Sequence, residues 1–214
     1  MFWRGQSYLV YGVWATLAVA FVWSLAEARW SMGFVALVTF LVTLAPGHIA
    51  ARYGVRVPMP FLSGVVLFIF ATLFLGEAVA FYERYWWWDI ALHGLSAVGF
   101  GMVGFIFIFV LFQGDRYAAP AWAVAFLGWC FAVAMGVSWE IFEFLMDQSF
   151  GLNMQKSGLI DTMWDLIVDL LGGAIGAGAG FLYLIGREEG GLPWLIGEFV
   201  RLNRRFFSRL GRRR

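Results

Sequence analysis

Long apolar runs, separated by short polar stretches, dominate the pattern along the chain. A helix needs about 20 mostly apolar residues to cross a bilayer, and six stretches meet this length. The second is the weakest, because Pro46, Gly47 and His48 interrupt its end. The pattern predicts an all-α, polytopic transmembrane helical bundle with a six-span domain over residues 1–190. The predicted spans are 8–28, 32–50, 59–82, 88–112, 120–146 and 158–185.

The composition agrees with a membrane protein and excludes several other classes. Hydrophobic residues make up 62% of the 214 residues and charged residues 14%, against about 45–50% and about 25% in soluble domains. The single cysteine, Cys130, excludes disulfides within the chain and cysteine-based zinc sites. The first apolar run exceeds the 7–15 residues, roughly, of a signal-peptide core, so we expect an uncleaved first span. No phosphate loop, dinucleotide fingerprint, serine nucleophile elbow or nucleic-acid module is present.

Basic residues are distributed unevenly between the predicted loops. Cytoplasmic loops of membrane proteins carry an excess of Lys and Arg. If both termini are cytoplasmic, the outside keeps only Arg29, Arg84 and Lys156, whereas most arginines lie inside. The aromatic stretch at residues 85–88 then falls at the outer membrane interface, where such residues are enriched. The sequence therefore predicts a multi-pass protein with both termini in the cytoplasm.

The C-terminal segment, residues 191–214, follows a different pattern. Large apolar residues recur at near-helical spacing, with arginines between them. This pattern is typical of a basic amphipathic helix that lies on an anionic membrane surface; a soluble basic tail is the alternative. We expect anionic lipids, rather than nucleic acid, to be the partner of this segment. The predicted membrane-surface residues are Arg201, Arg204, Arg205, Arg209 and Arg212.

Three aspartates lie one helical turn apart in the last predicted span. Asp161, Asp165 and Asp169 are spaced by four residues, which places them on one face of a helix. Ionisable side chains within spans are costly, usually face the bundle interior and often mark a functional site. These carboxylates therefore call for a physical explanation.

Other spans deliver ionisable side chains to the same depth. Asp89 and His93 lie at the start of the fourth span, whereas Glu140 and Glu143 lie near the end of the fifth. Under the predicted topology, both pairs fall in the outer half of the membrane, and Glu77 closes the third span at a similar depth. This convergence predicts one polar site shared by several spans.

The alternative for each residue is a structural role. Asp147 and Asp161 lie close to span ends, where solvation or the positive end of a helix dipole can accommodate a carboxylate. A lone buried histidine is more often a hydrogen-bonded structural residue than a ligand. His93, however, follows Asp89 by one turn, which favours membership of a site.

Clustered carboxylates must hold either cations or protons, because like charges disfavour one another's ionisation. Oxygen-rich sites suit Mg²⁺ or Mn²⁺, and an added imidazole also admits Zn²⁺. The absence of a Glu-x-x-His pair disfavours a di-iron centre. We therefore predict one divalent metal ion, Mg²⁺, Mn²⁺ or Zn²⁺. Its predicted ligands are Asp89, His93, Glu140, Glu143, Asp165 and Asp169.

Small residues accompany the acids. Gly172, Gly176 and Gly180 are spaced by four, and Ala97 and Gly101 follow His93 at the same interval. Such rows allow membrane helices to approach closely. The fourth and sixth spans are therefore expected to pack together, although glycine is also common in membrane helices in general.

Two stretches carry a resemblance to a known family. They are "FLGEAVAFYERYWWWDIALHGLSAVGFG" and "WEIFEFLMDQSFGLNMQKSGLIDTMWDLIVDLLGGAIGA". They resemble the bacterial inner-membrane family typified by YjdF and, more distantly, VanZ-like proteins, over roughly residues 70–180. The resemblance implies a location in the bacterial inner membrane and supports the topology and the place of the site, but it implies no activity.

Three functions are compatible with these residues. The first is a metal-dependent enzyme acting on a lipid or lipid-linked substrate near the outer leaflet, with Arg84 and Lys156 as candidate substrate-binding residues at the rim. The second is a cation or proton transporter, and the third is a structural or assembly subunit with a membrane-protein partner. No residue is assigned a catalytic role.

Overall fold

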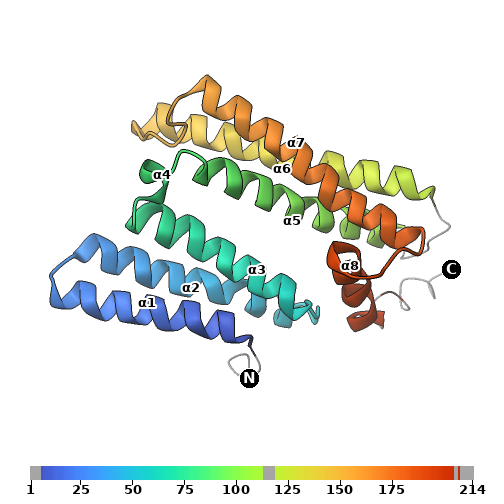
Figure 1. Ribbon diagram of the computed structural model, residues 1–214, viewed down its shortest axis with the longest axis horizontal. Coiled ribbons are helices and arrows are strands. Elements are labelled where there is room, and N and C mark those ends of the chain that lie inside the picture. Colours follow the sequence, from blue (N-terminus) through green and yellow to red (C-terminus); the bar gives the residue numbers. More distant parts are fainter. Residues whose placement is uncertain (1–5, 113–118, 205–206, 208–214) are drawn as a thin grey trace. The chain divides into compact units, whose positions relative to one another are not determined.

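The computed structural model describes residues 6–112, 119–204 and 207, and the chain divides into two compact units, Met1–Trp88 and Asp89–Arg214. The described residues form helices and no strand. Six helices are long and apolar enough to cross a membrane (Figure 1). The predicted all-α bundle of about six spans is thereby confirmed. Three of the predicted membrane-surface arginines lie outside the described residues: Arg205, Arg209 and Arg212.

The first unit contains three long apolar helical segments. Helix α1 spans Tyr8–Ala26, α2 spans Trp30–Arg52, and α3, Met59–Ile69, continues into a π-helical segment η1, Phe70–Ala78. The expected interruption near Pro46 is wrong, since α2 runs through this residue to Arg52. Proline removes one backbone donor but is tolerated in membrane helices, where neighbouring groups adjust.

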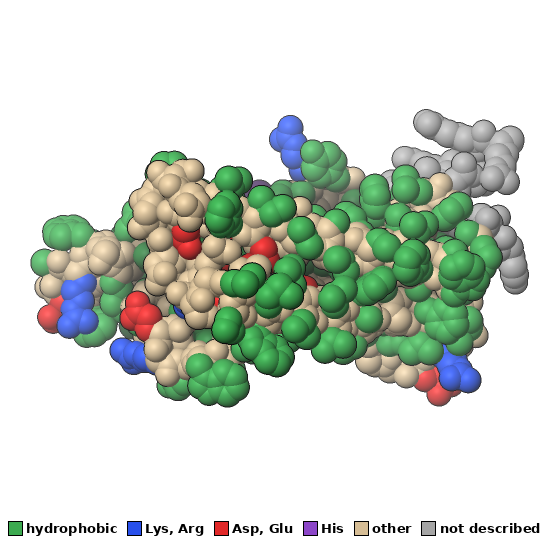
Figure 2. All heavy atoms as spheres, turned by 90° about the horizontal axis from the view of Figure 1, so that it is seen from above, with side chains coloured by type: hydrophobic (Ala, Val, Ile, Leu, Met, Phe, Trp, Pro, Cys, Tyr) green, Lys and Arg blue, Asp and Glu red, His purple; other side chains and the backbone are tan. Residues whose placement is uncertain are grey.

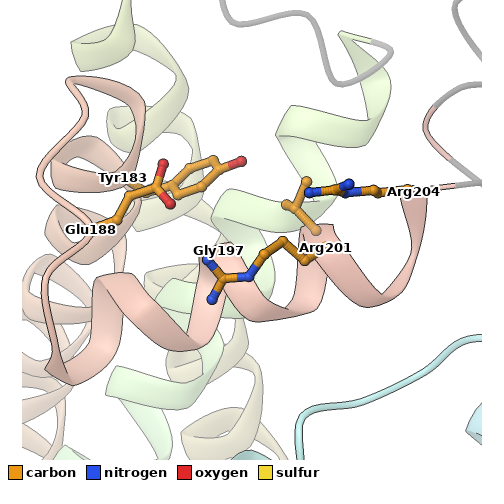
Figure 3. Close-up of a pocket in the computed structure, with 6 residues that line it drawn as sticks. Tyr183, Glu188, Gly197, Arg201 and Arg204 are labelled. Atoms are coloured by element: carbon orange, nitrogen blue, oxygen red, sulfur yellow. The ribbon is translucent and has the colours of Figure 1, made fainter.

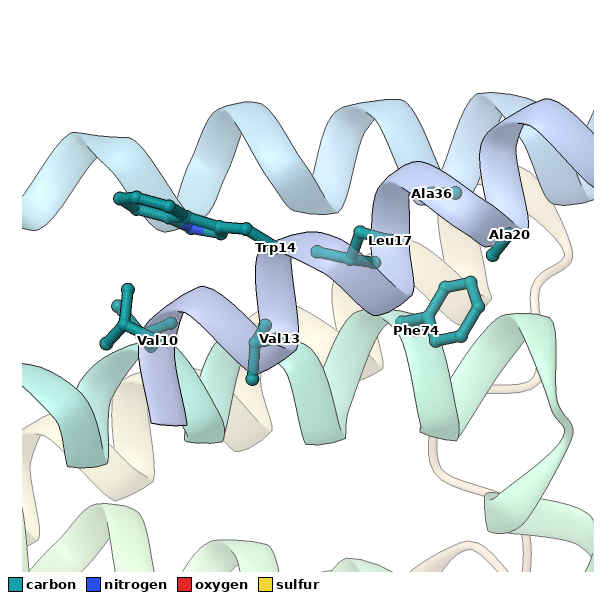
Figure 4. Packing of buried hydrophobic residues seen from close by; sticks show 8 residues of the cluster. Val10, Val13, Trp14, Leu17, Ala20, Ala36 and Phe74 are labelled. Atoms are coloured by element: carbon teal, nitrogen blue, oxygen red, sulfur yellow. The ribbon is translucent and has the colours of Figure 1, made fainter. Parts of the chain in front are cut away.

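One face of α1 forms the core of this unit. Val10, Val13, Trp14 and Leu17 recur every three or four residues and are nearly fully buried. They pack with Ala36 and Phe74 of the neighbouring helices (Figure 4). The Trp14 indole N–H donates to the Thr43 hydroxyl over 3.0 Å, which satisfies a polar group that would be costly to bury alone.

The third span ends earlier than expected. Helical structure stops at Ala78 instead of residue 82, and Ala80 adopts a left-handed conformation with φ of 60°. The chain then forms the short helix α4, Phe81–Arg84, which folds the Tyr82 ring against Gly76. A side chain at Gly76 would occupy the place of that ring, so the turn depends on this glycine.

The described part of the second unit contains three long helices and one short one. Helix α5 spans Trp88–Leu111, α6 spans Ala121–Phe150, α7 spans Leu159–Leu184 and α8 spans Gly191–Leu202. The three long helices run side by side, and α8 follows at the end of α7 (Figure 1). Helix α6 ends four residues later than predicted. It ends where Gly151 takes a left-handed conformation, a common way to stop a helix.

Glycines allow α5 and α7 to approach closely. A methyl group added to Gly176 would meet the Val98 carbonyl oxygen, and one added to Gly172 would meet the Gly94 carbonyl oxygen. Gly101 lies against the α7 backbone in the same way. The predicted packing of the fourth and sixth spans through small residues is therefore confirmed.

The outer surface of the helices is apolar. Large hydrophobic side chains such as Phe107, Leu171 and Ile175 are at least half exposed. Figure 2 shows hydrophobic side chains over much of the visible face, with acidic ones between them. Exposure of such a surface is unfavourable in water but not in lipid, in agreement with a membrane protein.

Candidate functional site

The acidic side chains and the histidine of the three long helices of the second unit gather at one end of these helices. This end combines the N-terminal turns of α5 and α7 with the C-terminal half of α6, because α6 runs antiparallel to both. His93, Glu140, Asp165 and Asp169 are all buried there. The sequence predicted this convergence, and the structure brings these four residues together.

His93 lies between two carboxylates. Its Nδ1 is 3.4 Å from Asp169 Oδ2, and its Nε2 is 3.8 Å from Glu140 Oε1. An ionised carboxylate can only accept a hydrogen bond, so an ionised Asp169 would accept the proton of Nδ1. The other ring nitrogen, Nε2, lies on the side that faces Glu140.

Two of the buried carboxylates have oxygens without a close hydrogen bond. Neither oxygen of Glu140 makes a hydrogen bond of standard geometry among the described residues, although the Thr162 hydroxyl interacts with this carboxylate, and Asp165 Oδ1 has no partner there. These two residues are only 4% and 1% exposed. A buried charge is stable only when it is paired or coordinates a metal. The unpartnered oxygens therefore mark the place where a cation or a proton is required.

Among the described residues, two groups of side chains have the spacing of metal ligands. His93, Glu140 and Asp165 each offer one atom within 4.8 Å of the others, and all three are buried. Asp89, Asp161 and Asp165 form a second such group, in which the first two are half-buried. Asp165 belongs to both groups.

The position of Asp169 depends on a glycine of α6. A methyl group added to Gly136 would lie against the Asp169 carboxylate, 2.8 Å from its Cγ. Any side chain at residue 136 would therefore displace this carboxylate from His93. No feature of the sequence pattern distinguishes this glycine from the others in α6.

Two other acidic residues considered in the sequence analysis already accept hydrogen bonds from neighbouring groups. Glu143 is buried and accepts a hydrogen bond from the Trp139 indole N–H over 3.0 Å. Asp147 accepts from the backbone N–H groups of Met154 and Gln155, over 2.7 and 3.0 Å. Asp147 thus stabilises the turn after α6, in agreement with a structural role.

Three more candidates are exposed. Glu77 and Arg84 are exposed and belong to the first unit. Lys156 is exposed in the turn before α7 and interacts electrostatically with Asp161. Asp161 was not among the predicted ligands, although its spacing of four from Asp165 was the available signal.

A second polar feature lies where α7 meets α8. A cavity of about 300 Å³ is lined by side chains of both helices and of the connecting turn, among them Tyr183, Glu188, Arg201 and Arg204. In Figure 3 the side chains of Tyr183 and Arg204 point toward one another across this space. Arg201 also pairs with Glu198, with Nη2 2.9 Å from the carboxylate oxygen.

The fold and the site together define a polytopic membrane protein with a buried carboxylate and histidine cluster. The chain belongs to the family described as "Predicted membrane protein (DUF2238)", whose model matches residues 9–186. The finer resemblance to YjdF-like and VanZ-like proteins stays a prediction.

One relative comes from Thermotoga maritima and is named "Uncharacterized protein". It is 33% identical over 104 residues, which cover 49% of this chain and 53% of the relative. The chain thus matches about half the length of that protein. No solved structure matches the chain.

Proposed function

We propose that this membrane protein binds a divalent cation through His93 Nε2, Glu140 and Asp165, and that Asp169 orients His93. The observation that carries the proposal is the burial of Glu140 and Asp165 with carboxylate oxygens that make no hydrogen bond of standard geometry among the described residues. A cation between these residues would supply the missing partner for both.

The distances support this assignment. Zn²⁺ binds imidazole nitrogen and carboxylate oxygen at about 2.0–2.2 Å. A cation therefore fits between His93 Nε2 and Glu140 Oε1, which are 3.8 Å apart. The other pairs of ligand atoms in this group lie up to 4.8 Å apart. Side-chain movements of less than about 1 Å would bring them to bonding distance from one cation. A carboxylate that holds the far nitrogen of a ligating histidine, as Asp169 does, is a recurrent feature of metal sites.

The donor set favours some metals over others. Imidazole suits Zn²⁺, whereas carboxylates also suit Mg²⁺ and Mn²⁺. One nitrogen and two carboxylate donors therefore favour Zn²⁺ or Mn²⁺ over Mg²⁺ at this position. Three protein ligands leave a coordination position for water or substrate, as in catalytic zinc sites.

We infer a metal-dependent enzyme that acts on a lipid or lipid-linked substrate. The cluster lies at one end of the spans, and under the arginine-based topology this end belongs to the outer half of the bacterial inner membrane. A cation there can activate water or polarise an oxygen of a substrate. The lipid face of the helices is apolar, so a substrate can reach this depth from the bilayer.

A cation or proton transporter is the alternative, but the placement of the charges disfavours it. A pathway requires polar groups through the whole membrane. Beyond His93 in α5, before Glu140 in α6 and after Asp169 in α7, these helices contain no Asp, Glu, Lys, Arg or His. An assembly role with a membrane-protein partner remains a third proposal, for which the basic tail is the candidate docking segment.

The membrane-surface role proposed for the C-terminal segment has support in α8. Arg201 and Arg204 line the cavity between α7 and α8, where the phosphate of an anionic lipid would meet two guanidinium groups. Basic residues near an anionic surface each contribute about 1 kcal/mol to binding. The partner proposed for this segment is therefore an anionic lipid.

Metal analysis of the purified protein tests the cation proposal. After dialysis against Zn²⁺ and removal of excess metal, we expect bound zinc in the wild type and its loss in Glu140→Gln and His93→Gln. Glu189→Gln is the matched control, since Glu189 is exposed beyond the other end of α7. Zinc and a chelator should also shift the melting temperature in opposite directions, because a ligand of the native state stabilises it. A wild type without metal and without these shifts would refute the proposal.

A further inference from the structure

Asp165 occupies a special position among the ionisable residues of the second unit. It is the one residue shared by the two groups that have ligand spacing, His93–Glu140–Asp165 and Asp89–Asp161–Asp165. It is 1% exposed, and its Oδ1 has no hydrogen-bond partner among the described residues. A carboxylate has two oxygens and about four lone pairs, so it can serve two cations at once.

We propose that Asp165 bridges two divalent cations, one held with His93 and Glu140 and a second held with Asp89 and Asp161. This inference rests on the proposed function, since the first cation is the one described above. Two-metal sites in enzymes have cations about 3.5–4 Å apart, which is a separation that a bridging carboxylate can span.

The two positions differ in burial. His93, Glu140 and Asp165 are all buried, whereas Asp89 and Asp161 are half-buried. Asp89 and Asp161 also lie nearer the helix ends, at the second residue of α5 and the third residue of α7. The first cation is therefore enclosed, and the second lies at the mouth of the site and exchanges more readily.

The two positions also differ in chemistry. The enclosed position offers one imidazole nitrogen and two carboxylates, which suits Zn²⁺ or Mn²⁺. The outer position offers carboxylates only, which suits Mg²⁺ or Mn²⁺. Mn²⁺ is accepted by both donor sets and is therefore the metal with which both positions can be examined together.

The number of charges favours a second cation. Besides Asp165, the carboxylates of Asp89, Asp161, Glu140, Glu143 and Asp169 gather at this end of α5, α6 and α7, and no Lys or Arg lies within these three helices. One divalent cation offsets two of these six charges. A second offsets two more, which reduces the repulsion that would otherwise require the carboxylates to take up protons.

The same absence of basic residues determines how a phosphate-bearing substrate would have to be held. A phosphate or diphosphate group has no guanidinium or ammonium partner within these helices, so the cations themselves must hold it. The half-buried outer cation offers this contact, with the exposed Lys156, which interacts with Asp161, at the rim. The site is thus suited to a membrane lipid that carries a phosphate or diphosphate headgroup.

Manganese binding to the purified full-length protein tests this inference. Free Mn²⁺ gives a six-line paramagnetic resonance signal that is lost on binding, so titration yields the number of bound ions. We expect two ions in the wild type, with a spectrum showing magnetic coupling between them, and two in Glu189→Gln. Asp161→Asn should bind one uncoupled ion, and Asp89→Asn provides the same test should Asp161→Asn fail to fold. Inorganic pyrophosphate should tighten the weaker wild-type site and have no such effect in Asp161→Asn.

The outcomes separate this inference from the proposed function. A single ion in the wild type that Asp161→Asn retains would overturn the two-cation site and leave the His93 site intact. Two ions without magnetic coupling would overturn the bridging role of Asp165. A wild type that binds none would overturn both proposals. Tightening by pyrophosphate that persists in Asp161→Asn would overturn the assignment of the phosphate group to the outer cation.

Discussion

His93 Nδ1 lies 3.4 Å from Asp169 Oδ2, so a carboxylate of α7 holds the imidazole of α5 in one orientation. The opposite nitrogen then faces Glu140 of α6. This relationship joins three helices at one residue, and it separates the role of Asp169, which positions the ring, from those of Glu140 and Asp165, which are proposed to bind metal.

Asp169→Asn is expected to weaken zinc binding without abolishing it. An amide holds Nδ1 less strongly and can present its NH₂ group instead, so the ring loses its fixed orientation. Loss of such an outer partner typically costs about 10–100-fold in metal affinity. Competition with a chromophoric chelator measures the change, and Glu189→Gln should bind as the wild type does. Unchanged affinity in Asp169→Asn would contradict the positioning role.

Gly136→Ala is expected to weaken zinc binding through the same residue. The added methyl group would collide with the Asp169 carboxylate and move it away from His93. Competition with the same chromophoric chelator measures the zinc affinity of this variant. Gly178→Ala is the matched control, because nothing lies within 4 Å of a methyl group at Gly178. Equal affinities of the two alanine variants would show that Asp169 tolerates the displacement.

Gly176→Ala is expected to destabilise the second unit. A methyl group at Gly176 would meet the Val98 carbonyl oxygen, whereas Gly178 on the same helix faces open space. Overpacking typically costs about 1–3 kcal/mol, while an unobstructed glycine-to-alanine change in a helix is favourable by roughly 0.5–1 kcal/mol. Thermal unfolding in detergent should therefore give a lower melting temperature for Gly176→Ala than for Gly178→Ala. The reverse order would contradict the close packing of α5 and α7.

Both chain termini are expected in the cytoplasm. The prediction follows from the excess of arginines on one side of six spans. Fusions after Arg214 of a reporter active only in the cytoplasm and of one active only in the periplasm measure the orientation. A matched pair fused within residues 151–157 should give the opposite result. Periplasmic activity at Arg214 would overturn the topology and with it the placement of the acidic site in the outer half.

Replacing the tail arginines is expected to weaken lipid binding. A peptide of residues 191–214 with Arg204, Arg205, Arg209 and Arg212 changed to Gln should bind anionic vesicles more weakly than the native peptide. The difference should shrink at high salt, because screening reduces the attraction. Flotation with vesicles of zwitterionic lipid is the control. Equal binding of both peptides to anionic vesicles would exclude the electrostatic contribution.

Much of the fold could be predicted from the sequence, because its signals act locally. A sufficiently long apolar run predicts a membrane-spanning helix, because in lipid the backbone must form all its hydrogen bonds within the segment. For this reason all six expected spans correspond to helices in the structure, although their ends differ by several residues. The ends were less predictable because they depend on single turns, such as the left-handed residues Ala80 and Gly151.

The candidate site, too, could be predicted from the sequence only in part. A spacing of four places Asp161, Asp165 and Asp169 on one face of a helix, and this follows from helix geometry alone. Which neighbour each carboxylate meets depends on the rotation and axial shift of the adjacent helices, which no spacing within one helix defines. Only the tertiary structure therefore placed His93 between Glu140 and Asp169, and only it showed that Asp165 is common to two ligand groups.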